Sequence, residues 1–472
     1  MGRSYSRQST NLNLGIGNLL VVVVGAASAL LMAWDIGIPY YCLFGISCLC
    51  LFYLSLANTT AAICLFMFLC PLMFLVRNLA PNDIVLAGVT SIWVFILTLG
   101  WGVLLLQGRA RFPSGPDVTA LGVFVAYAFV MAMISVSVLD IFLGLRSLVV
   151  PIAVFFIVRG VVAQKPSAGY PILISILIST AIMAIISYAW YMEYLKLGKL
   201  FSEGIIAGGG GRFVLGHYFE RMDSLIGGGP SNVGIFFGVG TIICMALEVG
   251  KRIPLWKKAI FLVLGMIAAY AAFLSLSRST IVLIMVSLMA LLLSATTYKT
   301  AKVLMLSAVG VLTVGVVFGT SFSNATLLTV ISRDAIQWIQ AIPTDFGMIV
   351  GNGLTASGGN LVGGQQATIF IDDGWPGIWR MLGLPGALSI LTFCWLLVYN
   401  YYRLAKTRTI NPKCYATGII AGIAALGLLF GSAHTAIIIR PVTCMVFYTL
   451  AAIMFSIYAS SRNTTPSLAR KV

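Results

Sequence analysis

The sequence predicts an all-α, polytopic integral membrane protein, and three observations lead to this fold class. Sixty per cent of the 472 residues are hydrophobic, only 9% are charged, and the mean hydropathy is +1.02. Apolar runs of roughly 17–25 residues, the length that a helix needs to cross a bilayer, recur along the whole chain. No hydrophilic block of about 100 residues, the usual size of a soluble domain, interrupts them. We therefore expect a single transmembrane domain over residues 1–472.

The apolar runs define fourteen expected spans. The first follows a polar N-terminus that contains Arg3 and Arg7. Because no convincing cleavage site ends this run, we interpret it as a span and not as a signal peptide. An even number of spans places both termini on the same side of the membrane. The expected spans are residues 15–34, 38–56, 60–77, 84–107, 118–139, 147–163, 170–192, 231–249, 259–277, 279–297, 302–319, 375–402, 415–433 and 441–460.

The charges predict the orientation of these spans. The net charge of +16 comes from 29 Lys and Arg residues against 13 Asp and Glu residues. With the N-terminus in the cytoplasm, 19 of the 29 basic residues lie inside, and 11 of the 13 acids lie outside, Asp117 and Glu248 being the exceptions. This asymmetry follows the positive-inside rule. The basic residues occupy short segments between spans and form no long tract with interleaved aromatics, so nucleic acid is not expected as a partner.

The nine cysteines and two histidines do not indicate a metal site. Every cysteine lies within or at the end of an apolar run, and no Cys/His group has the spacing of zinc ligands. Asp372 and Asp373 are adjacent, so their side chains diverge on a regular element. We therefore interpret the cysteines as small core hydrophobes, and we expect neither a bound metal nor a cofactor.

Two external segments are long enough to carry function. The first, residues 193–230, contains the glycine runs Gly208–Gly211 and Gly227–Gly229. The second, residues 320–374, contains a stretch with helical spacing at Asp334–Ile342 and a glycine-rich part. Long connections in compact domains are usually functional, so we expect both to contribute to a site on the outer face.

The basic residues that remain outside are mostly arginine. A requirement for charge alone would be met equally well by lysine. The guanidinium, in contrast, is a planar and permanently charged group that binds two phosphate oxygens at once, so the preference indicates phosphate recognition. The alternative is that each arginine only snorkels to the interface or pairs with a helix-terminal carbonyl. The ten external residues are Arg77, Arg146, Lys196, Lys199, Arg212, Arg221, Arg278, Arg333, Arg380 and Arg440.

Arg278 is the only charge between Lys258 and Lys299. The apolar runs on its two sides, 259–277 and 279–297, are each just long enough for one crossing. We therefore expect a tight outer hairpin with Arg278 at the turn, where the surrounding hydroxyl groups satisfy the freed backbone groups and Ser279 caps the next helix. A tight turn needs polar residues but does not need arginine.

Five short segments follow one another along the chain in an informative order. They are Gly144-Leu-Arg146-Ser-Leu-Val-Val-Pro151, Arg221 leading to Gly229-Pro-Ser-Asn232, Ser275-Leu-Ser-Arg278-Ser-Thr280, Arg333-Asp-Ala-Ile-Gln-Trp338 leading to Gly351-Asn-Gly353, and Asp372-Asp373 leading to Gly383-Leu-Pro-Gly386. In order, spacing and sidedness these segments resemble the O-antigen ligase and polymerase superfamily over about residues 140–400. Among its members, the chain resembles the Wzy-type polysaccharide polymerases. The resemblance implies a GT-C-like fold.

The resemblance also implies an activity, which is transfer of a glycan from undecaprenyl pyrophosphate to the acceptor hydroxyl of another lipid-linked repeat unit. Asp372 and Asp373 are the expected general base, although an acid at this place also suits the start of a helix. His434 is the second candidate for the base. The residues expected to bind substrate, above all its pyrophosphate, are Arg221 and Arg278, then Arg146 and Arg333, with Arg212, Asn232, Arg380 and Arg440.

Two other functions remain open at this point. Ligases of the superfamily carry a His-Asn pair where Asp372-Asp373 stands here, which favours a polymerase over a ligase that transfers glycan to lipid A. A transporter or flippase for lipid-linked sugar needs arginines that reach the middle of the membrane, whereas these lie at span ends and in two loops. The resemblance implies a bacterial inner membrane location, cytoplasmic termini and a site that faces the periplasm. Expected partners are membrane lipid, a chain-length regulator and a flippase.

Overall fold

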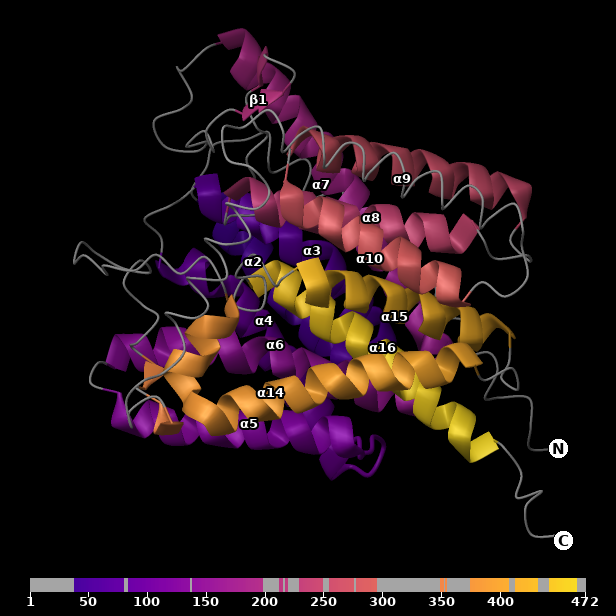
Figure 1. The fold of residues 1–472 in the computed structure, drawn as a ribbon. Helices are drawn as coiled ribbons and strands as arrows, with labels where there is room; N and C mark the ends of the chain where they lie inside the picture. Colours follow the sequence, from indigo (N-terminus) through magenta and orange to yellow (C-terminus); the bar gives the residue numbers. More distant parts are fainter. Residues whose placement is uncertain are drawn as a thin grey trace, which may run out of the picture.

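The computed structural model is a bundle of long α-helices that lie side by side (Figure 1). The structure describes residues 38–79, 84–135, 138–197, 212–214, 217–219, 229–248, 254–275, 277–294, 349–351, 353–354, 374–406, 412–431 and 441–464. Its helices are α2 (Ile38–Ala57), α3 (Thr59–Leu79), α4 (Ile84–Leu106), α5 (Pro116–Ile134), α6 (Val138–Gln164), η1 (Pro166–Ala168), α7 (Gly169–Leu197), α8 (Gly229–Glu248), α9 (Leu255–Leu274), α10 (Arg278–Ser294), α14 (Gly374–Lys406), α15 (Pro412–Gly431) and α16 (Pro441–Thr464).

The helices agree with the fold class that the sequence predicts. Each α-helix of the described part overlaps one of the expected spans, while the expected spans 15–34 and 302–319 lie outside the described residues. By length and composition, eight described helices can cross a membrane. They are Val89–Leu106, Pro116–Ile134, Gly144–Gln164, Pro166–Ala189, Leu255–Leu274, Met381–Lys406, Lys413–Gly431 and Val442–Ser461. The protein is therefore a helical, multi-pass membrane protein.

Two short strands depart from the all-helical expectation. β1 (Arg212–Val214) and β2 (His217–Phe219) pair antiparallel between α7 and α8, with Phe213 opposite Tyr218. Aromatic and β-branched residues, which these strands contain, favour extended backbone. The hairpin places Arg212 at the first position of β1, beyond the end of α7.

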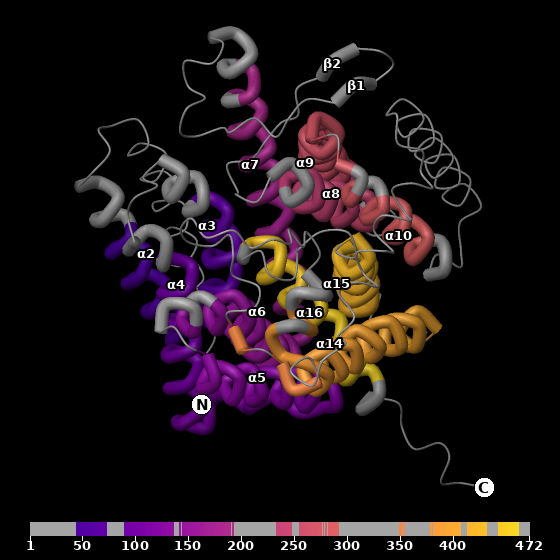
Figure 2. Tube along the Cα trace, turned by 60° about the vertical axis from the view of Figure 1, so that its left-hand side comes forward, coloured from indigo at the N-terminus to yellow at the C-terminus, as the bar shows by residue number. Residues whose placement is uncertain are grey.

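The centre of the bundle lies around α16. Of its apolar stretch Val442–Ser461, 89% is buried, against 28% for Leu255–Leu274 of α9, which lies at the periphery (Figure 2). Aromatic side chains join the central helices, because Phe155 of α6 makes edge contacts with Phe393 of α14 at 5.5 Å and with Phe455 of α16 at 6.1 Å between ring centroids. Such contacts add to the area buried by the rings themselves.

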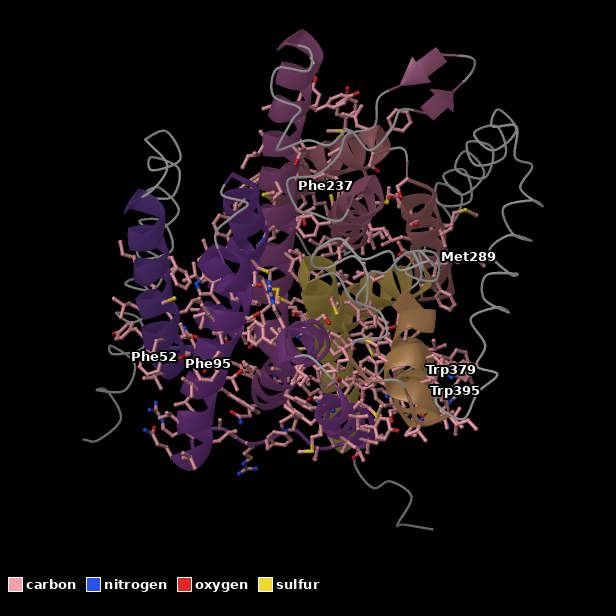
Figure 3. All side chains as sticks on the ribbon, turned by 90° about the vertical axis from the view of Figure 1, so that its left-hand side faces the viewer. Phe52, Phe95, Phe237, Met289, Trp379 and Trp395 are labelled. Carbon is pink, nitrogen blue, oxygen red and sulfur yellow. The ribbon has the colours of Figure 1, made fainter. Side chains whose placement is uncertain are left out.

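Apolar side chains also cover the outer surface of the bundle, as expected for a surface that meets lipid. Phe52, Phe95 and Trp395 are exposed at the perimeter, whereas Phe237 is fully buried in the interior (Figure 3). Because lipid tails are as apolar as these side chains, burial of apolar area alone does not hold such helices together, and close packing of small residues takes its place. Gly427 of α15, for example, lies directly against Ser287 of α10, whose hydroxyl donates to the Ile423 carbonyl at 3.3 Å.

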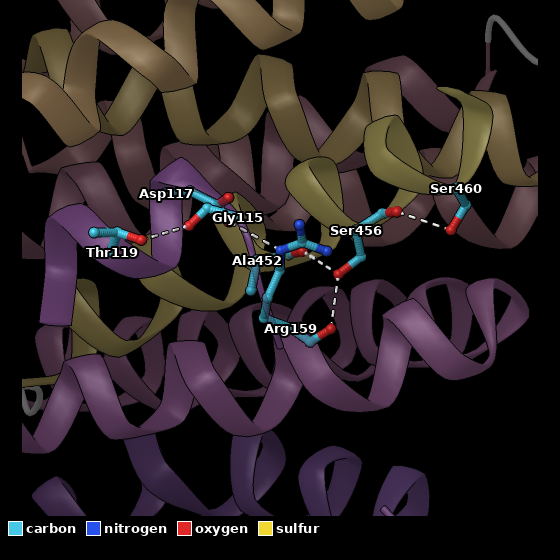
Figure 4. Close-up of polar contacts among 7 residues, drawn as sticks. All are labelled: Gly115, Asp117, Thr119, Arg159, Ala452, Ser456 and Ser460. Carbon is cyan, nitrogen blue, oxygen red and sulfur yellow. Dashed lines mark hydrogen bonds and ion pairs between the residues drawn. The ribbon is translucent and has the colours of Figure 1, made fainter. Parts of the chain in front are cut away.

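A buried ion pair joins α5 to α6. Arg159 Nε donates to Asp117 Oδ2 at 2.9 Å, and the two side chains are only 4% and 3% exposed (Figure 4). Ser456 of α16 donates to the Arg159 carbonyl at 3.1 Å and so ties a third helix to the pair. Asp117 lies in the first turn of α5, where the helix dipole favours an acid. Asp117, one of the two acids that the charge pattern predicts on the cytoplasmic side, is therefore paired with Arg159.

Candidate functional site

The helix ends of the bundle differ in the residues that they carry. At one end, which we call the loop end, α5, α7, α9 and α15 finish and α6, α8, α10, α14 and α16 begin (Figure 1). The segment between α7 and α8 therefore begins and ends at this end. At the opposite end, which we call the basic end, lie Lys165, Lys257, Lys258, Arg403, Lys406 and Lys413. The candidate functional site therefore lies at the loop end.

The first cluster at the loop end is formed by the start of α8 and the hairpin between α9 and α10. Gly234, in the second turn of α8, lies so close to the hairpin that a Cβ atom would overlap Ser275 Oγ and Thr280 Oγ1. This contact could not be predicted from the sequence, because an apolar run does not show which of its glycines contacts another helix. The contact brings the first turns of α8 and α10 together, and with them the backbones of Asn232 and Arg278.

The hydroxyl groups of this cluster are not all satisfied. Ser275 Oγ donates to the Ala272 carbonyl at 2.6 Å, as expected at a helix end. Ser277 Oγ and Thr280 Oγ1, however, are buried without a hydrogen-bond partner among the described residues, although their side chains are only 2% and 3% exposed. A buried hydroxyl without a partner costs about 1–3 kcal/mol. The expectation that the hydroxyls around Arg278 satisfy the turn is therefore wrong for these two.

The electrostatics of the first cluster favour an anion. Backbone N–H groups in the first turn of a helix have no partner within the helix and carry a partial positive charge. Here two such helix starts meet, at Gly229–Asn232 and at Arg278–Thr280, and two unpaired hydroxyl donors lie beside the second. Helix starts with converging donors are common phosphate-binding sites.

The second cluster joins α5, α6 and α14 to residues 349–354. Tyr127 of α5 donates its hydroxyl to the Val350 carbonyl, and the Leu354 N–H donates to Ser135 Oγ at 2.8 Å. Gly144 of α6 makes room for Leu354, since a Cβ at Gly144 would lie 2.8 Å from the Leu354 Cβ. Gly351 and Gly353 of the sequence motif are therefore held at the loop end, next to the helix that carries Arg146.

α14 is broken where this segment meets it. Gly383 has φ 58° and ψ −162°, a backbone conformation that is essentially restricted to glycine, so α14 consists of two helices that meet at a kink. A Cβ at Gly383 would lie 2.5 Å from Gly351 N. Gly351 and Gly383, which belong to two motifs that the sequence only places in order, are thus in direct backbone contact.

Two side chains near this junction complete the second cluster. Arg146 is half-buried on α6, two residues after Gly144. It lies in the third turn of a helix that begins at Val138, near the start of the stretch Gly144–Gln164 that is long and apolar enough to cross a membrane. Trp379, on the part of α14 before the kink, buries an indole N–H for which the described chain offers no acceptor.

The remaining residues of the expected site are described in part. For Arg212 in β1, Asn232 in α8, Arg278 at the first position of α10 and Arg380 in α14, the structure describes the backbone, and all four backbones lie at the loop end. The residues Asp372, Asp373, His434, Arg221, Arg333 and Arg440 lie outside the described residues.

The two clusters share one end of the bundle but are separate. α15 contacts α8 and α10 on one side and α14 on the other, and Figure 2 shows it between them. Within the described ranges, no group of three or more His, Cys, Asp or Glu side chains could hold a metal ion. No protein-family model matches the chain, and neither a curated protein nor a solved structure shows significant similarity to it.

Proposed function

We propose that the protein is a membrane glycosyltransferase that polymerises lipid-linked repeat units into a polysaccharide. In this reaction, the donor is a glycan on undecaprenyl pyrophosphate, and the acceptor is a hydroxyl group of a second lipid-linked repeat unit. The single observation that carries the proposal is the meeting of the α8 and α10 helix starts at Gly234, beside unpaired hydroxyl donors and the backbone of Arg278. This arrangement is suited to holding a pyrophosphate.

The chemistry requires two functions from the chain. A base takes the proton of the acceptor hydroxyl as its oxygen bonds to the anomeric carbon of the donor sugar. The bond from that carbon to the pyrophosphate oxygen breaks, and the electron pair leaves with the pyrophosphate. Cationic and N–H groups stabilise the charge that develops on this leaving group. We assign the base to Asp372 or Asp373, with His434 as the second candidate, and the stabilisation to the arginines.

The arginines fall into three groups in this proposal. Arg278 and Arg221, with Asn232, bind the pyrophosphate at the first cluster. Arg146 and Arg380 act from the second cluster, and Arg212, Arg333 and Arg440 bind the substrate from other parts of the chain. The proposal includes a GT-C-like arrangement of fourteen spans in a bacterial inner membrane, with both termini cytoplasmic and the site facing the periplasm. Membrane lipid, a chain-length regulator and a flippase are the proposed partners.

Replacing Thr280 with valine tests whether the Thr280 hydroxyl serves the reaction or only the stability of the fold. Because the Thr280 hydroxyl has no partner in the described structure, its removal is expected to leave the thermal unfolding temperature unchanged or to raise it. If the hydroxyl donates to bound pyrophosphate, Thr280→Val lowers turnover of a lipid-linked repeat unit by about tenfold, the value of one hydrogen bond.

Thr241→Val is the matched control for this change. Thr241 is equally buried, on α8, but its hydroxyl donates to the Phe237 carbonyl of its own helix at 3.1 Å. This variant is expected to retain turnover. A Thr280→Val protein that turns over like the wild type would contradict the assignment of the first cluster to the substrate.

A strain without the gene distinguishes polymerisation from transport. If the protein is a polymerase, single repeat units still reach the outer face and accumulate there, because only their joining is lost. If it is a flippase, the glycan is missing from the outer face altogether. The measurement is surface glycan by size-resolved gel, with and without the gene.

A further inference from the structure

The segment at residues 349–351 and 353–354, which we call the docked segment, holds α14 by its backbone. An alanine Cβ at Gly351 would lie 2.7 Å from the Met381 carbonyl oxygen and 2.9 Å from Gly383 N. Gly351 has φ 105° and Gly383 has φ 58°, so both positions have the left-handed backbone that favours glycine. Two backbones can approach this closely only where neither residue has a side chain.

The docked segment is fixed in turn by α5. The Tyr127 hydroxyl donates to the Val350 carbonyl, and Ser135 Oγ accepts from the Leu354 N–H at 2.8 Å. Ser135 Oγ also donates to the Met131 carbonyl at 3.0 Å, which orients its lone pair towards Leu354. These bonds hold the segment at both of its ends, four residues apart in sequence.

Because α14 is broken, the contact with the docked segment affects the position of residues 374–382. Residues 374–382 are separated from the rest of α14 by the non-helical Gly383, so the long part of the helix after the kink does not fix their direction. The contact with the docked segment lies at the break itself.

We propose that the docked segment sets the position of residues 374–382, and that Tyr127 and Ser135 are positioning residues for the candidate site. The functional consequence rests on the proposed function, since the positioned part of α14 carries Arg380. Neither Tyr127 nor Ser135 touches substrate in this proposal. They act through the docked segment, by holding residues 374–382 in one direction.

The test is amide hydrogen exchange of the purified full-length protein in Tyr127→Phe and Ser135→Ala variants. Each variant removes one hydrogen bond of the docked segment and leaves the ring or the backbone in place. We expect amide exchange in peptides that cover 349–354 and 374–382 to become about fivefold to tenfold faster. This factor corresponds to the free energy that one hydrogen bond contributes. Ser135→Thr keeps the acceptor oxygen and is expected to restore slow exchange.

Two controls show whether the effect is specific. Tyr415→Phe removes a tyrosine hydroxyl that donates to the Ala405 carbonyl at the basic end. Thr392→Val removes a hydroxyl of α14 that bonds to the Leu388 carbonyl of its own helix at 2.8 Å. Both are expected to leave exchange at 349–354 and 374–382 unchanged.

Turnover of a lipid-linked repeat unit supplies the second readout. A positioning role predicts lower kcat with KM little changed in Tyr127→Phe and Ser135→Ala, and recovery in Ser135→Thr. Unchanged exchange in both variants overturns the proposal outright. Faster exchange at 349–354 without faster exchange at 374–382 overturns the claim that the segment positions this part of α14. If the wild type shows no turnover, the proposed function fails, while the exchange data still decide the role of the docked segment.

Discussion

Arg278→Ala is expected to lower the formation of polymer by about 100-fold or more, the cost of removing one donor from a charge-stabilising site. Arg278 is the first residue of α10, at the cluster where two helix starts meet. In the proposed reaction, its guanidinium stabilises the charge that develops on the leaving pyrophosphate. The measurement is glycan length and turnover of a defined lipid-pyrophosphate repeat unit by the purified protein in vesicles.

Two companion variants make this result specific. Arg278→Lys keeps the charge but loses the two parallel hydrogen bonds of a guanidinium, so an intermediate loss is expected. Arg403→Ala removes an exposed arginine at the basic end, next to Tyr399, and is expected to retain activity. Lengthening by Arg278→Ala at the wild-type rate would contradict the pyrophosphate role of this arginine.

The second large effect concerns stability. Asp117→Ala is expected to lower the free energy of unfolding by about 3–5 kcal/mol, because it leaves the Arg159 guanidinium buried without its counter-charge. The hydrogen bond from Ser456 of α16 goes to the backbone carbonyl of Arg159 and not to the guanidinium, so it stays in place in this variant (Figure 4). Thermal unfolding in detergent, followed by size-exclusion chromatography, measures the effect.

The double variant Asp117→Leu with Arg159→Met shows how much of the lost free energy of unfolding comes from the unpaired charge and how much from the loss of the ion pair itself. Replacing a buried pair by apolar residues of similar volume is often nearly neutral, so most of the lost stability is expected to return. Unfolding of the double variant at the same temperature as Asp117→Ala would contradict this explanation.

The helices themselves could be predicted from the sequence, because the length of an apolar run reports directly on a membrane crossing. The expected span 170–192 lies within α7, and the hairpin at Arg278 is confirmed by helices that end at Leu274 and begin at Arg278. A helix can also extend beyond the apolar run that predicts it. α6 begins at Val138, nine residues before the expected span 147–163, whereas the part of α6 that can cross a membrane, Gly144–Gln164, agrees with that span.

The contacts that build the candidate site could not be predicted, because they join residues far apart in the chain. Leu354 bonds to Ser135 over 219 positions, and Arg159 pairs with Asp117 over 42. A glycine or a serine in an apolar run carries no signal of its partner. The kink at Gly383 is an intermediate case, since the Gly-Leu-Pro-Gly segment marks the place of a break but not the segment that contacts it.

The most direct test of the central claim is reconstitution of the wild-type protein in vesicles with one defined lipid-pyrophosphate repeat unit and no other protein. The products are released from lipid and separated by size. The proposed function predicts a ladder of glycans longer than the single unit, with release of free lipid pyrophosphate. Repeat units that cross the bilayer and stay single would contradict polymerisation and indicate transport.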